Sequence, residues 1–249
     1  MEIALKEVSG CFHPLQMTFT RFLAGGLFLI RFAVRTLKKK KASLNWKDLP
    51  GFLLLGFVGM VLSMSIYQMS VKEVPASVVA VLFSSNPIFT AVLAFFMLKE
   101  PIRRNQIAAL LLEIGGILAI INPFHISLSP YGVLLAMIST LLFAVYGVMG
   151  KRRCARFGGV VVTCASFLCG GAEMLFMILF SRLPMVNKWL AGSGLELFAN
   201  IPLLSGYSWN TLPWMLMICI VNTGLGFACY FKAMEETSAQ ETSLVFFLK

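Results

Sequence analysis

The sequence predicts an all-α membrane protein, a polytopic helix bundle, and three observations lead to this fold class. Hydrophobic residues make up 58% of the 249 residues and charged residues only 13%, whereas about a quarter of the residues in a soluble domain are charged. The mean hydropathy is +0.83. The chain also divides into apolar segments close to the roughly 20 residues that a helix needs to cross a bilayer. Lipid is therefore the expected solvent for most of the chain.

Seven apolar segments and the beginning of an eighth are expected to form membrane helices, with Pro, Gly and charged residues at their boundaries. The segments cover about 15–34, 49–71, 76–98, 107–121, 131–149, 159–180 and 212–233, and the eighth begins near Ala239. The long connection at about 181–210 is moderately polar. A short interfacial helix around 189–198 is an option that the sequence leaves open.

Basic residues gather in the loops between alternate segments, and the net charge is +10. If the 38–41 loop is cytoplasmic, thirteen basic residues share its side: Arg35, Lys38, Lys39, Lys40, Lys41, Lys47, Lys99, Arg103, Arg104, Lys151, Arg152, Arg153 and Arg156. Four lie on the other side: Lys6, Lys72, Arg182 and Lys188. This asymmetry follows the positive-inside rule. The basic residues are therefore interpreted as orientation signals, and no nucleic-acid partner is expected.

An internal repeat relates the two halves of the chain. One constant offset, which we call the tyrosine register, places Tyr67 on Tyr230 together with Leu49-Pro50 on Leu212-Pro213, Glu73 on Glu236, Ala76 on Ala239 and Phe83 on Phe246. A second, the glycine register, places Gly25-Gly26 on Gly170-Gly171 together with Thr18 on Thr163 and Phe22-Leu23 on Phe167-Leu168. Leu and Phe matches arise easily by chance in apolar sequence, whereas matched Pro, Tyr, Glu and paired Gly carry more weight.

The period of this repeat is five segments. Because five is odd, the second repeat must enter the membrane from the opposite side, and inverted repeats are a recurrent design of secondary transporters. We expect two inverted five-helix repeats, at 1–121 and 131–249. The same alignment predicts a ten-span parent protein of which about eight spans are present here, with one helix before Met1 and roughly one and a half after Lys249.

Several stretches resemble one known family. They are Arg21-Phe22-Leu23, Tyr67 followed by Ala76, Asn86-Pro87, the helix end Leu98-Lys99-Glu100, and Tyr230-Phe231-Lys232-Ala233 followed by Ala239 and Glu241. With the ten-span arrangement, they resemble the EamA-domain branch of the drug/metabolite transporter (DMT) superfamily. Lys99 departs from the family, which often has Gly before this Glu. The resemblance implies cytoplasmic termini, alternating access and movement of a small organic solute (an amino acid, metabolite or drug), often outward.

Ionisable residues inside the expected helices are candidates for function, because a charge is costly in hydrocarbon. Arg21, Glu113 and Glu173 are the candidates for an intramembrane or coupling charge, and Lys232 is expected to snorkel to the cytoplasmic surface. Snorkelling is an open alternative for Arg21 as well. Glu113 lies in the middle of its segment, where Gly115-Gly116 would allow close approach of another helix.

Neutral polar residues give the candidates for substrate binding: Tyr67, Ser85, Asn86, Tyr146, Asn222 and Tyr230. Pro87 leaves the carbonyl of Phe83 without its helical donor, so the Asn86-Pro87 pair predicts a broken helix. Free carbonyls at mid-membrane are tolerated where they line a cavity. A simple kink at Pro87, and aromatic-belt positions for Tyr67 and Tyr230, remain alternatives.

These observations predict a secondary transporter in the cell membrane, with lipid and a small organic solute as partners and a homodimer left open. The alternatives are an integral-membrane enzyme and a non-transporting scaffold. No catalytic motif is visible, and the two histidines, His13 and His125, are far apart. The six cysteines lack CxxC spacing, so neither a metal site nor a disulfide framework is expected. No cofactor is expected.

Overall fold

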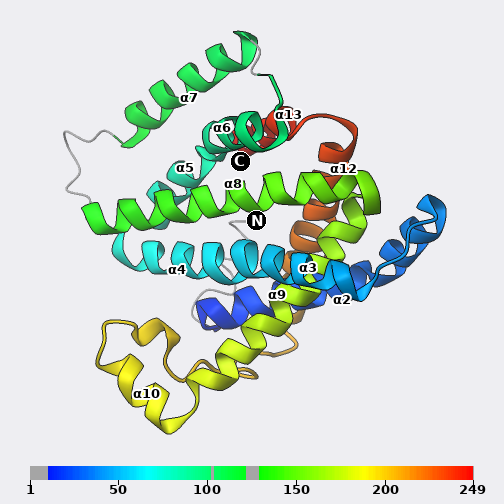
Figure 1. Cartoon of the computed structure of the whole chain (residues 1–249). Coiled ribbons are helices and arrows are strands. Elements are labelled where there is room, and N and C mark those ends of the chain that lie inside the picture. The colour runs from blue at the N-terminus through cyan, green and yellow to red at the C-terminus, as the bar shows by residue number, and fades with distance from the viewer. Residues whose placement is uncertain (1–10, 102–103, 122–128, 249) are drawn as a thin grey trace.

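The computed structural model describes residues 11–101, 104–121 and 129–248, and every regular element in these ranges is helical (Figure 1). Within them, six helical stretches are long and apolar enough to cross a bilayer: Pro14–Lys40, Trp46–Glu73, Ala76–Leu98, Pro130–Phe157, Gly159–Ser181 and Leu212–Glu236. They coincide with the first, second, third, fifth, sixth and seventh predicted segments. The predicted polytopic helix bundle agrees with this architecture, while the count of eight spans in a ten-span parent stays a prediction.

The helix of the first segment, α2 (Pro14–Lys40), is longer than its apolar run. Its N-cap is His13, whose Nδ1 accepts a hydrogen bond from the Leu15 amide at 3.3 Å. Its last turn holds Lys38, Lys39 and Lys40, and cations stabilise this end of a helix. The predicted end near residue 34 is therefore too early, because the basic residues continue the helix beyond the hydrocarbon.

The second and seventh segments share an unusual backbone. Each consists of two α-helices joined by a π-helical stretch: α3 (Leu49–Gly56), η2 (Phe57–Ser63) and α4 (Met64–Glu73), then α11 (Leu212–Leu216), η4 (Met217–Leu225) and α12 (Gly226–Glu236). The tyrosine register carries η2 onto 220–226, so the two π-helical stretches overlap. Such stretches are rare and occur often at functional sites.

The third segment is broken where the sequence predicts. It forms α5 (Ala76–Ser84) and α6 (Asn86–Leu98), with Ser85 between them. The following helices are α7 (Arg104–Ile121), α8 (Pro130–Phe157) and α9 (Gly159–Ser181). Only Gly158 separates α8 from α9, and its φ of 92° suits glycine.

Short elements complete the described chain: η1 (Trp46–Asp48), α10 (Pro184–Ala191), η3 (Glu196–Phe198), α13 (Ala239–Ser243) and η5 (Leu244–Leu248). The long connection thus contains a short helix, α10, that begins earlier than the predicted option. Figure 1 shows α10 and the connection after it beyond the end of α9, α3 and α4 alongside α8, and α7 at the margin of the bundle.

The Gly115-Gly116 pair of α7 does not form the expected close helix contact. Both residues are exposed. Within the described chain, a Cβ added at either glycine would meet no atom within 4 Å. The close approach predicted there is therefore absent from the described packing.

The centre of the bundle is the antiparallel packing of α2 against α9. Leu15, near the start of α2, shares a buried cluster with Ile178, near the end of α9. At the other end, Lys40 of α2 reaches the Cys154 carbonyl, close to the start of α9. The two helices therefore lie side by side and run in opposite directions.

Glycines allow α2 and α9 to approach the π-helical segments closely. A Cβ at Gly25 would lie 3.0 Å from the Cys219 carbonyl oxygen, and a Cβ at Gly170 would lie 3.1 Å from the Gly56 carbonyl oxygen. Larger side chains would push these backbones apart. The glycine register places Gly25 on Gly170, and the tyrosine register places Gly56 on Cys219, so the two contacts are equivalent.

The bundle has a basic end and an opposite end. At the basic end, Glu235 pairs with Lys40 and accepts a hydrogen bond from the Gly159 amide at 2.8 Å, and Arg156 pairs with Asp48 at 2.8 Å. Exposed tryptophans occur near both ends, Trp46 beside the basic loop and Trp189 and Trp209 in the long connection. Tryptophan favours the membrane–water interface, so the two ends fit the two faces of a membrane.

We expect cysteines at the two ends to react from opposite sides of the membrane. Ser43→Cys, in the basic loop, and Ser193→Cys, after α10, would replace exposed side chains. The background would carry Cys11→Ser and Cys229→Ser, because these native cysteines are exposed. In intact cells an impermeant maleimide should label Ser193→Cys alone, and Ser43→Cys only after the membrane is opened. Labelling of both variants from one side would contradict this topology.

Candidate functional site

A cavity of about 250 Å³ lies inside the bundle. Its lining comes from both halves of the chain, from α2, α4, α5, α8, η4, α12 and η5. The lining residues are Met17, Thr18, Arg21, Met64, Tyr67, Gln68, Phe83, Phe143, Asn222, Gly226, Phe227, Tyr230, Val245 and Phe246. Four predicted site residues are thus brought together from distant positions in the sequence: Arg21, Tyr67, Asn222 and Tyr230. We call this space the central cavity.

Two aromatic pairs line the central cavity. The rings of Tyr67 and Phe83 lie 5.3 Å apart between centroids at 85°. The rings of Tyr230 and Phe246 lie 5.5 Å apart at 69°. Phe83 and Phe246 join the two pairs in an edge-to-face contact at 6.3 Å and 78°. The tyrosine register carries the first pair onto the second, so equivalent residues meet around one space.

Asn222 and Tyr230, both in the lining, each have a buried polar atom without a hydrogen-bond partner among the described residues. The atoms are Asn222 Nδ2 and the Tyr230 hydroxyl. A buried polar group left unpaired costs about 1–3 kcal/mol. Native proteins keep few such groups, and each calls for an explanation such as a bound molecule or water. Asn222 belongs to π-helical η4 and Tyr230 to α12, and both side chains line the same cavity.

Arg21 gives the central cavity a positive charge. Its side chain is buried, with the residue only 9% exposed, which argues against the snorkelling alternative. The guanidinium lies 4.7 Å from the centroid of the Phe22 ring, and its Nη2 faces the sulfur of Met64 at 3.2 Å. A thioether is a weak acceptor. Among the described lining residues there is no Asp or Glu.

This charge decides which ligands the cavity favours. Two unit charges about 5 Å apart interact by about 3 kcal/mol at an effective dielectric constant of about 20. Contact of a cation with an aromatic face contributes about 0.5–2 kcal/mol. Repulsion from Arg21 therefore outweighs the attraction that the aromatic walls offer to a cation. An anionic group is attracted by the same guanidinium.

Ser85 and Asn86 lie outside the lining of the central cavity. The Ser85 hydroxyl donates to the Leu82 carbonyl at 2.6 Å. Asn86 is buried, donates from Nδ2 to the Thr140 carbonyl at 3.4 Å, and accepts from the Thr90 hydroxyl at 3.0 Å. The hydrogen bonds of both residues thus stabilise the junction between α5 and α6, and Asn86 also joins this junction to α8.

Tyr146 is also outside the lining. It is fully buried, and its hydroxyl lies 3.1 Å from the hydroxyl of Ser166. Its ring lies directly over Gly59 of η2, where a Cβ would come within 2.5 Å of it. This arrangement packs α8 between η2 and α9.

The two candidate acids are placed differently. Glu173 is half-buried in α9, and its Oε2 has no hydrogen-bond partner among the described residues. It does not line the central cavity. The side chain of Glu113, in α7, lies outside the described residues. Lys232 is half-exposed near the basic end and pairs with Glu236 at 2.7 Å, as expected of a snorkelling lysine.

Thr18, in the lining, was not among the sequence candidates. Its hydroxyl accepts a hydrogen bond from Gln68 Nε2 at 3.4 Å. The aromatic walls were missed as well, although the match of Phe83 with Phe246 in the repeat was a signal for them. For Thr18, the match with Thr163 gave the only signal in the sequence.

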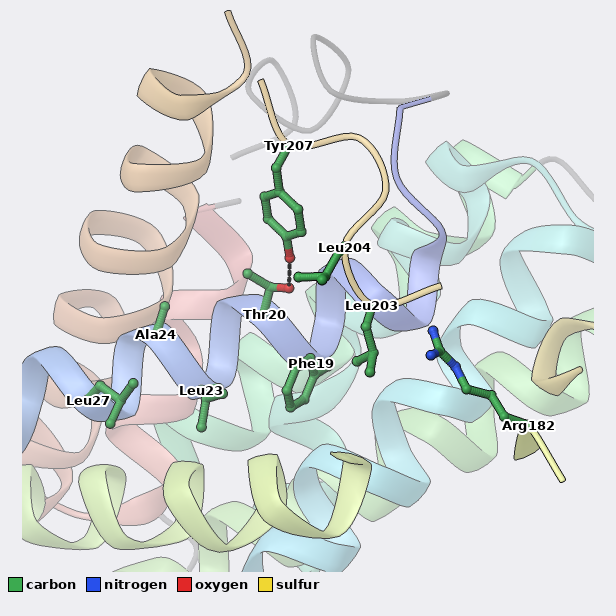
Figure 2. Close-up of a pocket in the computed structure, with 9 residues that line it drawn as sticks. All are labelled: Phe19, Thr20, Leu23, Ala24, Leu27, Arg182, Leu203, Leu204 and Tyr207. Carbon is green, nitrogen blue, oxygen red and sulfur yellow. Dashed lines mark hydrogen bonds between the residues drawn. The ribbon is translucent and has the colours of Figure 1, made fainter. Parts of the chain in front are cut away.

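A second hollow lies on another face of α2, and Figure 2 shows its lining. This groove has a volume of about 480 Å³ and is mostly apolar, with Phe19, Leu23 and Leu27 on one side and Leu203 and Leu204 on the other. The Thr20 and Tyr207 hydroxyls are 2.5 Å apart across it. Leu27 is 54% exposed, so the groove opens to the surface that lipid would cover. The central cavity is therefore the better candidate for a solute site.

Within the described residues, no three His, Cys, Asp or Glu side chains gather closely enough to hold a metal ion. The chemistry of the central cavity is that of binding, with aromatic walls, hydrogen-bond donors and one charge. A helical membrane bundle around such a cavity is the design of a membrane transporter.

Comparison with known sequences places the chain in a family of such proteins. The pattern of the EamA-like transporter family matches it twice, at residues 2–122 and 130–249. The chain therefore belongs to the EamA-like transporter family, and the resemblance found in the sequence is confirmed. It is a multi-pass protein of the cell membrane.

Individual relatives agree with this assignment. An uncharacterized transporter of Clostridium kluyveri is 30% identical over 246 residues, which cover 96% of this chain and 73% of the relative. The uncharacterized inner membrane transporter YedA of Escherichia coli is 28% identical over 240 residues, covering 86% and 74%. One solved crystal structure has a TM-score of 0.56 at 18% identity, covering 99% of this chain and 88% of the other, and shows a similar fold.

A comparison of Tyr230 with Tyr146 tests whether the Tyr230 hydroxyl is unpaired. We expect Tyr230→Phe to leave the stability of the solute-free protein unchanged or to raise it by up to about 1–3 kcal/mol, because it removes an unpaired buried group. Tyr146→Phe should lower stability by about 0.5–1.5 kcal/mol, since the Tyr146 hydroxyl is hydrogen-bonded to the Ser166 hydroxyl. Thermal unfolding in detergent measures both. An equal loss in the two variants would mean that the Tyr230 hydroxyl is paired.

Proposed function

We propose that this chain is a secondary transporter that moves a small organic solute across the cell membrane by alternating access, with the central cavity as its binding site. The observation that carries the proposal is the convergence of Asn222 and Tyr230, two buried groups without described partners, on a cavity that both halves of the chain line. Family membership supports transport rather than catalysis.

The inverted repeat is part of this proposal. Support comes from the equivalent ring pairs Tyr67–Phe83 and Tyr230–Phe246, which meet around the cavity. The glycine contacts of α2 and α9 are equivalent in the same alignment. The antiparallel packing of α2 and α9 is what inversion requires of the first and sixth segments. The family pattern also matches once in each proposed repeat, 1–121 and 131–249.

Alternating access requires contacts at each end of the cavity that break and form again. At the basic end, Lys40 and Glu235 join α2 to α12. At the opposite end, Gln16 of α2 donates to the Ser205 carbonyl at 2.8 Å and so holds the long connection. Both contacts are polar and lie at opposite ends of the bundle. In the proposed cycle they would open alternately.

We assign the candidate residues to three roles. Tyr67, Asn222, Tyr230 and Arg21 contact the solute. Ser85, Asn86 and Tyr146 position the helices around it. Glu113 and Glu173 remain the proposed coupling residues.

The outward direction of transport is what the family resemblance implies. The homodimer stays a prediction.

Counterflow in proteoliposomes tests the carrier. With the full-length protein, unlabelled solute inside the vesicles should accelerate entry of the labelled solute, and the rate should saturate. Asn222→Ala should reduce the apparent affinity about tenfold, because a hydrogen bond of about 1–3 kcal/mol is lost. Ser43→Ala, in the exposed basic loop, is the matched control. Flux without saturation or counterflow would identify a channel instead.

The coupling role is tested by pH dependence. We expect Glu173→Gln to flatten the pH profile of transport, because glutamine keeps the size of the side chain but cannot exchange a proton. Glu236→Gln changes an exposed carboxylate and should leave the profile as it is. Glu113→Gln completes the series. If the profile of Glu173→Gln matches the unmodified protein, the coupling role is removed from Glu173.

A further inference from the structure

We infer that the solute of the central cavity carries a carboxylate on a small aromatic or apolar body, and that Arg21 binds the carboxylate. The inference rests on the proposed function, since it names the class of solute for the same site. Its basis is the combination of the buried cation Arg21 and aromatic walls around one space, with Asn222 and Tyr230 in the same lining.

Arg21 offers hydrogen-bond donors in the lining of the central cavity. Its planar guanidinium has five N–H groups and no acceptor. A carboxylate has two oxygens that accept several hydrogen bonds, and arginine matches its geometry with two parallel bonds. The carboxylate is therefore the group that this guanidinium recognises best.

Beside Arg21, a solute carboxylate would compete with a weak acceptor. The sulfur of Met64 faces Nη2 at 3.2 Å, and a carboxylate oxygen is a much stronger acceptor than a thioether. The described lining contains no Asp or Glu. A solute carboxylate therefore meets an attractive charge and no repelling one where Arg21 lines the space.

A cationic solute is the main alternative to a carboxylate, and the charge of Arg21 disfavours it. Aromatic walls such as those of Tyr67, Phe83 and Phe246 would suit an ammonium group if they stood alone. Because Arg21 lies in the same buried space, a cation there meets a like charge in a medium that screens it poorly. The walls are then left to the apolar part of the solute, which packs against ring faces and edges.

The volume of the central cavity limits the size of the solute. Pockets for drug-sized ligands have volumes of about 300–1,000 Å³, and the central cavity has about 250 Å³. This volume favours a small metabolite over a large drug. A monocarboxylate with one aromatic ring or branched apolar group meets both the size limit and the chemistry.

A matched series of three compounds tests the inference with the purified full chain in detergent. The probes are 3-phenylpropanoate, its neutral amide and 3-phenylpropylamine, which share one apolar body and differ in charge. Dissociation constants come from isothermal titration calorimetry. The unmodified protein should bind the carboxylate about tenfold or more tightly than the amide, and the amine most weakly.

Variants of Arg21 identify the residue responsible. Arg21→Gln should bind the carboxylate no better than the amide, with the affinity for the amide unchanged, which also shows that the cavity is folded. Arg21→Lys keeps the charge without the planar fork and should retain part of the preference. Arg152→Gln removes an exposed arginine outside the cavity and is the control. If Arg21→Gln does not fold, the reduced preference of Arg21→Lys carries the test.

Three outcomes overturn the inference: equal or tighter binding of the amide or amine by the unmodified protein, binding of none of the probes, and a carboxylate preference that survives in Arg21→Gln. Counterflow separates this test from the proposed function. A carboxylate preference without counterflow would contradict the carrier function and support the carboxylate site. Counterflow of neutral or cationic solutes without a carboxylate preference would support the carrier function and contradict the carboxylate site.

Discussion

Hydrocarbon offers no hydrogen-bonding partners, and this constraint determines how the chain places each polar side chain. Most polar side chains within the described helices satisfy themselves locally. The hydroxyls of Thr18, Thr140 and Thr163 donate to the carbonyl one turn earlier, each at 2.8–2.9 Å. Asn222 and Tyr230 are among the exceptions, because each has a buried polar atom without a partner among the described residues. Both residues line the central cavity, which is why they support the site that we propose.

Close backbone approach makes such a site possible in so small a bundle. Gly25 and Gly170 bring α2 and α9 against the π-helical segments, so that residues far apart in sequence reach one cavity. The π-helical turn of η4 changes the direction in which the following side chains point, and Asn222 lies within it. A regular α-helix would place Asn222 differently relative to Tyr230. Helix packing and binding chemistry thus depend on the same few turns.

The sequence predicted the fold class, six of the helical stretches and the break at Asn86-Pro87, because apolar length and proline act locally. The internal repeat in the sequence also identified Tyr67 and Tyr230 as equivalent positions. It could not separate Asn86 and Tyr146, which hold helices together, from Asn222 and Tyr230, which line the cavity. A polar residue in an apolar segment looks the same in either role. Only the rotation of its helix and the identity of its neighbour, Thr140 for Asn86 and Ser166 for Tyr146, decide between them.

The differences between the two halves explain why a repeated scaffold has one specific site. The tyrosine register places Gly59 on Asn222, and the glycine register places Arg21 on Ser166. The ring of Tyr146 covers Gly59, and its hydroxyl is hydrogen-bonded to Ser166. Side chains therefore fill this equivalent region. In the other half-site, Asn222 and Arg21 line open space. The matched aromatic pairs build a symmetric frame, and the unmatched polar residues make one part of it the site that we propose for a charged group.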